Sequence, residues 1–330
     1  MRATRRGRPP TPAAADSPAA AAAAYAATGL FWMEDVLDAS AVATLAGECK
    51  EALGEVLRHL LLKDVIAQHG GTDSPPVAYS EVVQRTGGRY DSRHRMAEAP
   101  FSSLLRRGGL AAGLIPALKA VLGDEAEVVA VGQIVAMSPE WELLEEHADQ
   151  AWHTDGRGNR ETDALTVFLP LVDLTPTNGA TQYLLGSHLE AEGARVAAMS
   201  DDERARAATT LHLRAGSAVA FDYRLHHRGL LNADLADRPV LYAIVGRPIW
   251  TADGCKGLPD LDRGGSVSLL TGETDVPPAP SFRLGADAPT DEPGAAAAAA
   301  EDLGGQSRPS AAAPRRSSPR TKRPRSSELL

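Results

Sequence analysis

The sequence Trp152-His153-Thr154-Asp155-Gly156 is followed closely by Ala164-Leu165-Thr166-Val167-Phe168-Leu169-Pro170-Leu171-Val172. The second run is apolar and contains several β-branched residues, which predicts a buried strand. Alternate residues of a strand point to the same face, so His153 and Asp155 can aim at one point while Thr154 points away. Imidazole and carboxylate groups at this spacing are suited to bind one metal ion.

A third metal ligand is expected from another strand-like segment further along the chain. Residues 217–224 read as a strand and run into Leu225-His226-His227-Arg228-Gly229. Adjacent strand residues face opposite sides, so the spacing alone admits His226 or His227 but not both. Two histidines and one carboxylate form the facial ligand set of non-haem Fe(II) sites, which leaves positions open for small molecules. A chance surface triplet is the alternative, and the order of the surrounding motifs favours the metal.

Arg238 follows the histidine pair and precedes a strand-like run at Val240–Val245. A guanidinium can hold a carboxylate through two parallel charge-assisted hydrogen bonds, so Arg238 is a candidate for binding a dicarboxylate cosubstrate. The alternative is a surface arginine, because residues 232–237 form a polar loop. Further candidates to line the same pocket are Gln150, Trp152 and Thr181. Core packing is the alternative for the tryptophan, and solvent contact is the alternative for the other two.

The segment from about Val128 to Trp250 resembles the phytanoyl-CoA dioxygenase (PhyH-like) family of Fe(II)/2-oxoglutarate-dependent oxygenases. The matching motifs are Asp149–Gly156, Asn178–Tyr183, Gly186–His188, Phe221–Arg224, His227–Gly229, Asn232, Arg238–Tyr242 and Arg247–Trp250. The resemblance implies a double-stranded β-helix (jelly-roll) core, mainly β with flanking helices and α+β overall. It also implies that His153, Asp155 and His227 bind iron and that Arg238 binds the distal carboxylate of 2-oxoglutarate.

The resemblance further implies a dioxygenase that uses Fe(II), 2-oxoglutarate and O2, with ascorbate as reductant. It would hydroxylate a C–H bond of a small organic substrate and release succinate and CO2. Asp155 argues against the halogenating variant, in which a small residue at this position admits chloride. Two alternatives remain: a jelly-roll protein that binds a metal or small molecule without turnover, and a protein or chromatin hydroxylase, which the basic C-terminus would suit.

Two parts of the sequence depart from the family pattern. Ser138–Ala148 is longer and more acidic than the short turn expected there, and we expect it at the mouth of the site, where it bears on substrate choice. Val240 stands where related oxygenases often carry a hydroxyl group that assists the carboxylate. The contact with the cosubstrate is therefore expected to be slightly weaker.

The oxygenase domain is expected over residues 29–276, with a helical N-terminal part at 33–125 and the jelly-roll core at 126–252. Residues 1–28 and 277–330 are rich in Pro, Ala, Arg or Ser, a composition that cannot build a core, so both are expected to be disordered tails.

Apolar residues at helical spacing predict a helix over Met33–Gln68, with Asp38 or Ser40 as its cap, and a second helix covers Gly109–Leu122. Between these helices, Arg89-Tyr90-Asp91 is expected in a loop. There it would either read the substrate at the mouth of the site or fix the loop through a buried polar network.

Charge and cysteine content narrow the class of protein. Residues 1–16 carry a net charge of +3 and residues 308–330 carry +6, so the rest of the chain carries −18 within the overall −9. This acidic middle argues against nucleic-acid binding by the folded part. Cys49 and Cys255 form neither a zinc motif nor a disulfide framework, which suits a reducing compartment.

No segment is apolar and long enough to predict a membrane span. We therefore expect a cytoplasmic protein. The Arg-rich N-terminus as an organellar signal and the basic run Pro319–Arg325 as a nuclear signal are the alternatives.

Overall fold

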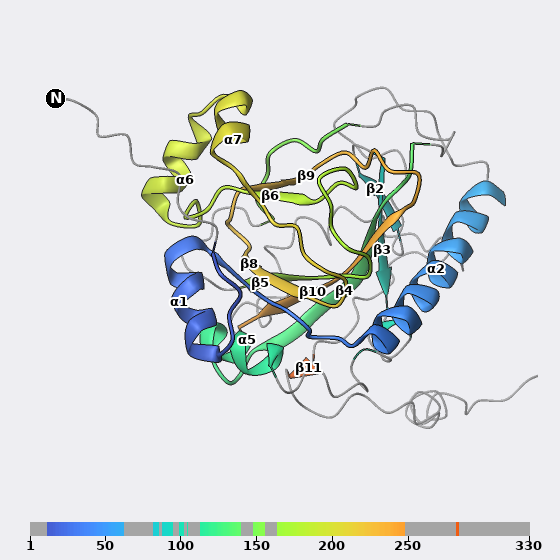
Figure 1. Ribbon diagram of the computed structural model, residues 1–330, viewed down its shortest axis with the longest axis horizontal. Coiled ribbons are helices and arrows are strands. Elements are labelled where there is room, and N and C mark those ends of the chain that lie inside the picture. The colour runs from blue at the N-terminus through green and yellow to red at the C-terminus, as the bar shows by residue number, and fades with distance from the viewer. Residues whose placement is uncertain are drawn as a thin grey trace, which may run out of the picture. The chain divides into compact units, whose positions relative to one another are not determined.

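The computed structural model describes residues 12–62, 82–85, 88–94, 99–101, 104, 113–139, 148–155, 164–247 and 282–283. The chain divides into the units Met1–Pro289 and Thr290–Leu330, and the second unit lies outside the described residues. The first unit contains two antiparallel sheets with helices beside them (Figure 1). The predicted fold class, mainly β with flanking helices, is confirmed.

The larger sheet, called the major sheet, has eight antiparallel strands. Seven of them follow the order β1-β8-β5-β10-β4-β3-β2, and β11 pairs with β4 beside this path. Their bounds are β1 Leu30–Met33, β2 Val82–Arg85, β3 Arg89–His94, β4 Glu127–Ala136, β5 Ala164–Pro170, β8 Ala218–Asp222, β10 Arg238–Gly246 and β11 Phe282–Arg283. The strand predicted from Ala164 onward is thus a central strand, and Arg238 is the first residue of its neighbour β10.

The smaller sheet, called the minor sheet, has the order β7-β6-β9. Its strands are β6 Thr181–Tyr183, β7 Thr209–Thr210 and β9 His227–Gly229, and the helices α6 Glu190–Ala197 and α7 Asp201–Ala207 lie between β6 and β7 in the chain. A capping box at Ser200 and Glu203 starts α7, because each side chain satisfies a backbone amide of the first turn. The minor sheet carries the second histidine of the predicted metal site.

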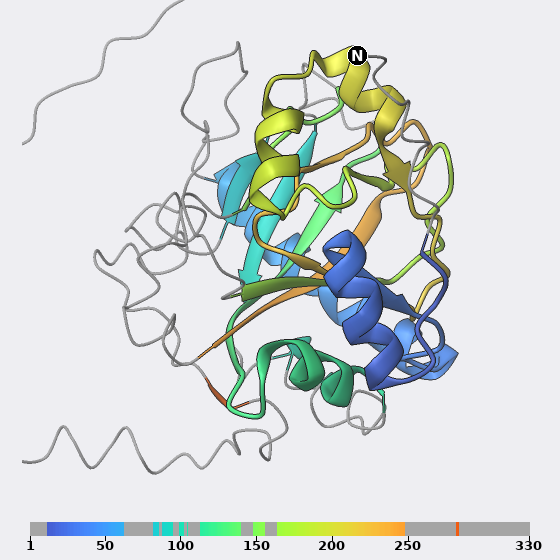
Figure 2. The ribbon, with the colours of Figure 1, turned by 90° about the vertical axis from the view of Figure 1, so that its left-hand side faces the viewer.

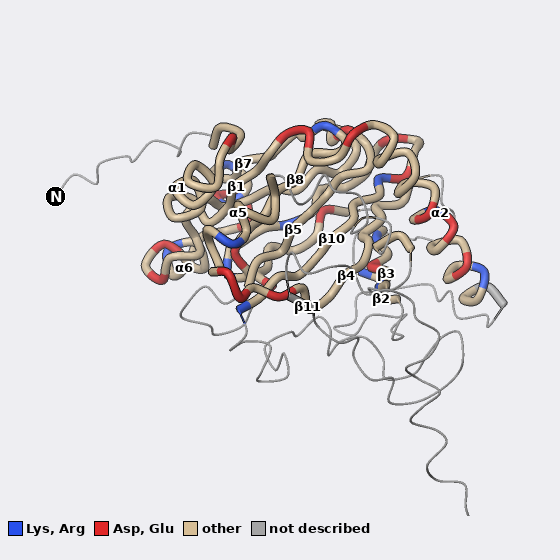
Figure 3. The backbone as a smooth tube through the Cα atoms, turned by 90° about the horizontal axis from the view of Figure 1, so that it is seen from below, with Lys and Arg blue, Asp and Glu red and all other residues tan. Residues whose placement is uncertain are grey.

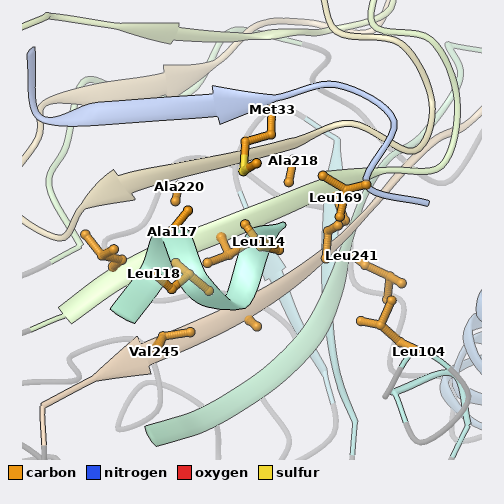
Figure 4. Packing of buried hydrophobic residues seen from close by; sticks show 14 of the residues in the cluster. Met33, Leu104, Leu114, Ala117, Leu118, Leu169, Ala218, Ala220, Leu241 and Val245 are labelled. Atoms are coloured by element: carbon orange, nitrogen blue, oxygen red, sulfur yellow. The ribbon is translucent and has the colours of Figure 1, made fainter. Parts of the chain in front are cut away.

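The main hydrophobic core lies between the outer face of the major sheet and two helices, α1 Pro18–Thr28 and α5 Leu114–Leu122. Figure 4 shows Leu114, Ala117 and Leu118 of α5 against residues of the central strands, including Leu169 and Leu241. Alternation within the strands explains the two faces, since Leu165, Val167 and Leu169 join this core while the intervening residues point to the other side. That other side, called the inner face, carries the site.

Helix α1 corrects the expectation that residues 1–28 form a disordered tail. Ser17 caps the helix by accepting a hydrogen bond from Ala20, Pro18 occupies its first turn, and Gly29 ends it with a φ of 82°. Ala21 and Tyr25 are buried. Composition alone suggested disorder, but the Ser-Pro start and the glycine stop are helix boundaries. The small alanine side chains let the helix pack closely against the core. Figure 2 shows the position of α1 in the fold.

Helix α2 Ala39–Leu62 is shorter than the predicted Met33–Gln68. Met33 belongs to β1, and Asp38 caps the helix by accepting the amide of Ala41 at 2.7 Å, as predicted for one of two candidates. Residues 63–68 lie outside the described residues, as do residues 109–112 of the second predicted helix. No helix among the described residues combines the length and the hydropathy needed to cross a bilayer.

Strands β2 and β3 correct the prediction of a helical region over 33–125 and of a loop at Arg89–Asp91. The two strands form an antiparallel pair, and β3 continues the major sheet beside β4. On the outer face Tyr90 packs under α2, whereas on the inner face β3 carries polar side chains. The sequence did not predict this strand, because its residues that face the site are polar and the strand therefore lacks the usual pattern of alternating apolar and polar residues.

Candidate active site

The backbone holds His153 and His227 together. The amide of each residue donates to the carbonyl of the other, with N···O distances of 3.0 and 2.9 Å. Directly opposed residues of an antiparallel bridge carry their side chains on one face. The two imidazole rings consequently lie with their centroids 4.3 Å apart.

Each imidazole ring is oriented by a backbone carbonyl. The Nδ1 atom of His153 donates to the carbonyl of Ala151 at 2.9 Å, and that of His227 donates to the carbonyl of Leu225 at 2.9 Å. A proton fixed on Nδ1 leaves the lone pair on Nε2, which is the arrangement of histidines that bind metals. Both Nε2 atoms are therefore prepared as ligands.

The carboxylate of Asp155 is oriented from the major sheet. Thr166, on β5, donates a hydrogen bond to Oδ2 of Asp155 at 2.8 Å. The other oxygen, Oδ1, lies 3.9 Å from Nε2 of His153 and 3.5 Å from Nε2 of His227. The hydroxyl thus occupies one carboxylate oxygen and leaves the second for a metal.

The three side chains fit a single divalent ion. Their ligand atoms all lie within 4.8 Å of one another. Two neighbouring ligands of one ion lie about 3 Å apart when each bond is near ~2.1 Å, so a closure of at most about 2 Å brings the group to coordination distance. Two neutral histidines and one carboxylate make the facial set that suits Fe(II).

The neighbouring His226 is not part of this cluster. Its backbone amide donates to Oγ of Ser187 at 2.8 Å, and its carbonyl accepts from the amide of Leu184. From the sequence, either His226 or His227 could have been the third ligand. In the structure His227 is the histidine that lies with His153 and Asp155. Ser187 thus holds the backbone of a residue 39 positions further along the chain.

Arg238 is a buried cation. Its side chain and backbone together are 4% exposed, and within the described part of the chain no carboxylate pairs with it and its Nε has no hydrogen-bond partner. Burial lowers the pKa of Arg238 to about 9, assisted by the positive charge of Arg89. The guanidinium still keeps its proton at neutral pH. A buried charge without a partner is costly, so this position is suited to an anionic ligand.

Thr181 and Tyr183 lie on β6, and Tyr183 is close to the candidate metal ligand His227. The ring of Tyr183 stacks on that of His227 with centroids 6.3 Å apart. Burial raises the pKa of Tyr183, and the charge of Asp155 adds to this, while a hydrogen bond with Thr181 and the charge of Arg238 act in the opposite direction. The charges of both Asp155 and Arg238 therefore act on the hydroxyl of Tyr183.

Gln150 binds the backbone of β9. The backbone amide of Gln150 donates to the carbonyl of Gly229 at 2.9 Å. The side-chain oxygen Oε1 of Gln150 accepts a hydrogen bond from the backbone amide of Gly229 at 3.0 Å. A Cβ atom at Gly229 would lie 2.7 Å from Oε1 of Gln150 and 2.9 Å from Nε of Arg89. Only glycine leaves room for both side chains.

Trp152 lies on the other side of this strand. Its ring packs with Leu184, Val196 and Ala208 beside α6 and α7, and the guanidinium of Arg228 stands 4.8 Å from the ring centroid. This is the core packing that the sequence left as the alternative to pocket lining. Trp152 therefore stabilises β9 through its contact with the guanidinium of Arg228.

The family follows from a comparison with known proteins. The family model for phytanoyl-CoA dioxygenase (PhyH) matches residues 25–240 of the 330. The chain belongs to the phytanoyl-CoA dioxygenase family. The predicted family is thereby confirmed. The match begins inside α1, which agrees with the packed position of that helix.

Individual relatives of this family member are distant. The dioxygenase easH of Epichloe festucae var. lolii is 31% identical over 94 residues, which are 26% of this chain and 47% of that protein. The chain thus spans about half the length of this curated relative. The crystal structure of AviO1 from Streptomyces viridochromogenes Tue57 is 21% identical, with a TM-score of 0.50 over 72% of this chain and 97% of that one. This likeness shows the fold.

Sequence reasoning missed the contribution of two residues of this phytanoyl-CoA dioxygenase family site: Thr166 and Tyr183. Thr166 is the one polar residue within an apolar strand, which could have indicated a role on the inner face. Tyr183 alternates with Thr181 and so shares its face. Arg89 was a candidate from the sequence, as part of Arg89-Tyr90-Asp91, but it was expected in a loop and lies in strand β3.

Proposed function

We propose that this protein is an Fe(II)/2-oxoglutarate-dependent dioxygenase that hydroxylates a C–H bond of a small organic molecule and releases succinate and CO2. One observation carries the proposal: a His-Asp-His cluster lies in the same site as a buried arginine without an acidic partner among the described residues. The first suits a divalent metal and the second suits a carboxylate ligand.

Nε2 of His153, Oδ1 of Asp155 and Nε2 of His227 would hold iron, and Arg238 would hold the distal carboxylate of 2-oxoglutarate. Together with O2, the bound iron and cosubstrate supply an oxidant for the substrate C–H bond, and ascorbate keeps the metal reduced. The protein orients these groups. Thr166 fixes the carboxylate of Asp155, and the raised pKa of Tyr183 keeps that phenol neutral beside the metal cluster.

Asp155 separates this proposal from halogenation. Its carboxylate fills the third ligand position with a negative charge, so that position is not open to chloride. Hydroxylation of the substrate is the outcome that such a ligand set favours.

The test is succinate formation from 2-oxoglutarate with Fe(II), ascorbate and O2, for wild type and for His227→Ala, Arg238→Ala and His226→Ala. We expect turnover in wild type and in His226→Ala, and its loss in the other two variants. Some enzymes of this kind turn over only when their substrate is bound. The Fe(II)–2-oxoglutarate absorption band, measured without oxygen, would detect binding of the metal and cosubstrate in that case. A wild-type protein with neither turnover nor this band contradicts the proposal and favours a binding protein without catalysis.

A further inference from the structure

The inner face of the major sheet is apolar around Thr166, the residue whose hydroxyl fixes Asp155. Residues in register on neighbouring strands point to the same face, and so do residues two positions apart on one strand. The inner-face positions around Thr166 are therefore Phe168 and Pro170 on β5, Val219 and Phe221 on β8, and Val240, Tyr242 and Ile244 on β10. None of these side chains is charged.

Charge divides the inner face of β10 into two ends. Arg238 begins the strand, and Ile244 lies six positions later on the same face. Ile244 is opposite Thr166, so Asp155 is tied to the sheet at the end remote from the backbone of Arg238. The end with the cation suits the anionic cosubstrate of the proposed function. The apolar end is left to a ligand of different chemistry.

Two residues of the apolar end retain accessible surface. Phe168 and Ile134 are only partly buried, whereas Tyr242, which belongs to the same apolar cluster, is 7% exposed. The ring of Phe168 meets that of Phe221 edge-on, with centroids 5.1 Å apart, and Phe221 meets His227 in the same way at 4.8 Å. Phe168 therefore connects the candidate metal ligands with the apolar cluster, and it has surface left for a ligand.

Tyr242 offers its ring to this space, because its hydroxyl is engaged elsewhere. The phenol donates a hydrogen bond to Oδ1 of Asp91 on β3 at 2.9 Å, across the intervening strand β4. Gly132 of β4 makes room for it, since a Cβ atom there would lie 2.6 Å from both Cζ and the hydroxyl oxygen of Tyr242. Asp91 is also paired with Arg85 at 2.6 Å. The charged side chains of the inner face next to this ring thus begin on β3, beyond the hydroxyl.

We propose that the substrate is an uncharged apolar molecule that packs its carbon skeleton against Phe168, Ile134 and the ring of Tyr242. These three residues are called the apolar wall. The proposal rests on the proposed function and adds the class of substrate to it. An apolar skeleton is stabilised by leaving water, whereas a charged group without a partner is costly to bury against such a wall. Hydrocarbon chains and ring systems are therefore favoured over amino acids and organic acids.

The experiment uses three fluorinated probes of similar size that differ in charge. 4-Fluorotoluene is uncharged, 4-fluorobenzoate is an anion, and 4-fluorobenzylamine is a cation at neutral pH. Each probe is added to the full-length protein with 2-oxoglutarate and without oxygen, and its fluorine NMR relaxation is measured with Mn(II) and with Zn(II). Mn(II) is paramagnetic and accelerates relaxation only at short range. The difference between the two metals therefore reports a probe that binds beside the metal.

We expect Mn(II)-dependent relaxation of 4-fluorotoluene, with both charged probes binding at least about tenfold more weakly. Ile134→Thr should weaken 4-fluorotoluene by about threefold to tenfold, because it removes apolar contact and adds a hydroxyl group. Ile115→Thr is the matched control and should match wild type. Ile115 is also a partly buried isoleucine, but it lies on α5 and packs against the main core.

A charged probe that binds as tightly as 4-fluorotoluene overturns the inference, as does equal binding of 4-fluorotoluene to the Ile134→Thr and Ile115→Thr variants. If Ile134→Thr fails to fold, Phe168→Leu decides in its place, since weaker binding of 4-fluorotoluene supports the apolar wall and unchanged binding contradicts it.

Calorimetry of the same samples keeps this result separate from the proposed function. A wild type that binds Mn(II) and 2-oxoglutarate but gives no Mn(II)-dependent relaxation of 4-fluorotoluene contradicts the substrate class alone. A wild type that binds neither the metal nor 2-oxoglutarate contradicts the function itself.

Discussion

The hydroxyl of Thr166 makes one hydrogen bond to the carboxylate of Asp155, a proposed metal ligand, and a single substitution can remove it. Thr166→Val keeps the shape and removes the donor to Asp155. Partners of metal ligands typically contribute 10–100-fold in metal affinity, so we expect Mn(II) to bind about tenfold more weakly in calorimetry. Thr209→Val is the control, because Thr209 is also buried and its hydroxyl has no hydrogen-bond partner among the residues that the structure describes. Equal effects of both substitutions would show that Thr166 only fills space.

Gly229 gives a second prediction, independent of any ligand. A Cβ atom there would collide with Gln150 and Arg89, so Gly229→Ala should lower the free energy of unfolding by about 1–3 kcal/mol, as overpacking does. Gly47→Ala is the matched control, since Gly47 lies within α2 with no atom within 4 Å of the new Cβ. That change should stabilise by about 0.5–1 kcal/mol, because alanine favours a helix. Urea unfolding measures both, and shifts of the same sign would contradict the packing at Gly229.

The candidate metal ligands could be predicted from the sequence, whereas their supporting residues could not. His153 and Asp155 follow from alternation on one strand, and the family resemblance selected His227, which the structure places with them. Thr166 is brought to Asp155 only by the approach of the major sheet. Such contacts depend on how two sheets face each other, which local spacing does not contain.

Helix α1 is tied to the turn that precedes His227. Tyr25 donates a hydrogen bond to Asp222, whose carboxylate also accepts from the amide and the guanidinium of Arg224. Burial would raise the pKa of Asp222, but the hydrogen bonds from Arg224 and Tyr25 outweigh it and hold the pKa below its usual value. The N-terminal helix thereby stabilises the turn that leads into the metal site.

Tyr25→Phe tests this connection. We expect a loss of about 1.5–3 kcal/mol in the free energy of unfolding at pH 7, the usual contribution of a hydrogen bond to a charged group. A lowered carboxyl pKa stabilises above the unfolded value of about 3.9 and loses its effect as the pH falls through the folded pKa. The difference between wild type and variant should therefore shrink in urea titrations below about pH 4. A difference that stays constant over this range would exclude the ionised Asp222 as the partner.

The elements that were predicted wrongly have one physical cause. Residues 18–28 are mostly alanine and β3 is mostly polar, so neither shows the hydrophobic periodicity of a helix or strand. Both are stabilised by tertiary contacts: α1 by the core and the Asp222 bond, and β3 by its pairing with β4. Strands β5 and β10, in contrast, could be predicted because each is a nearly continuous apolar run that contains β-branched residues.

Among the described residues, acidic side chains lie along helix α2 and several arginines lie on the inner face of the major sheet. Figure 3 shows Asp and Glu along α2, whereas β2, β3 and β10 place Arg85, Arg89 and Arg238 towards the site. Arg85 is paired with Asp91 at 2.6 Å. The positive charge that an anionic cosubstrate needs is thus kept inside a chain that is negative overall.

Metal removal should change the stability of the whole molecule. The proposed ligands join the minor sheet, through His227, to a segment held by Thr166 of the major sheet. A metal at about 100 times its dissociation constant adds about 2.7 kcal/mol, which corresponds to about 5–10 °C in Tm for a domain of this size. We expect EDTA to lower the Tm of the Mn(II)-loaded protein by this amount. His227→Ala should show no metal-dependent change, and a full shift in that variant would place the metal elsewhere.

The pairing of the first strand has a consequence for synthesis of the chain. Among the described strands, β1 pairs with β8 alone, and Tyr25 and Asp222 are 197 positions apart. At the usual rate of translation, roughly 10–40 s pass between the appearance of the two partners. During this time the apolar sequence Leu-Phe-Trp-Met of β1 leaves the ribosome with no strand to pair with, and an unpaired apolar strand is prone to aggregate. Chaperone binding to the nascent N-terminus is the protection that this topology requires.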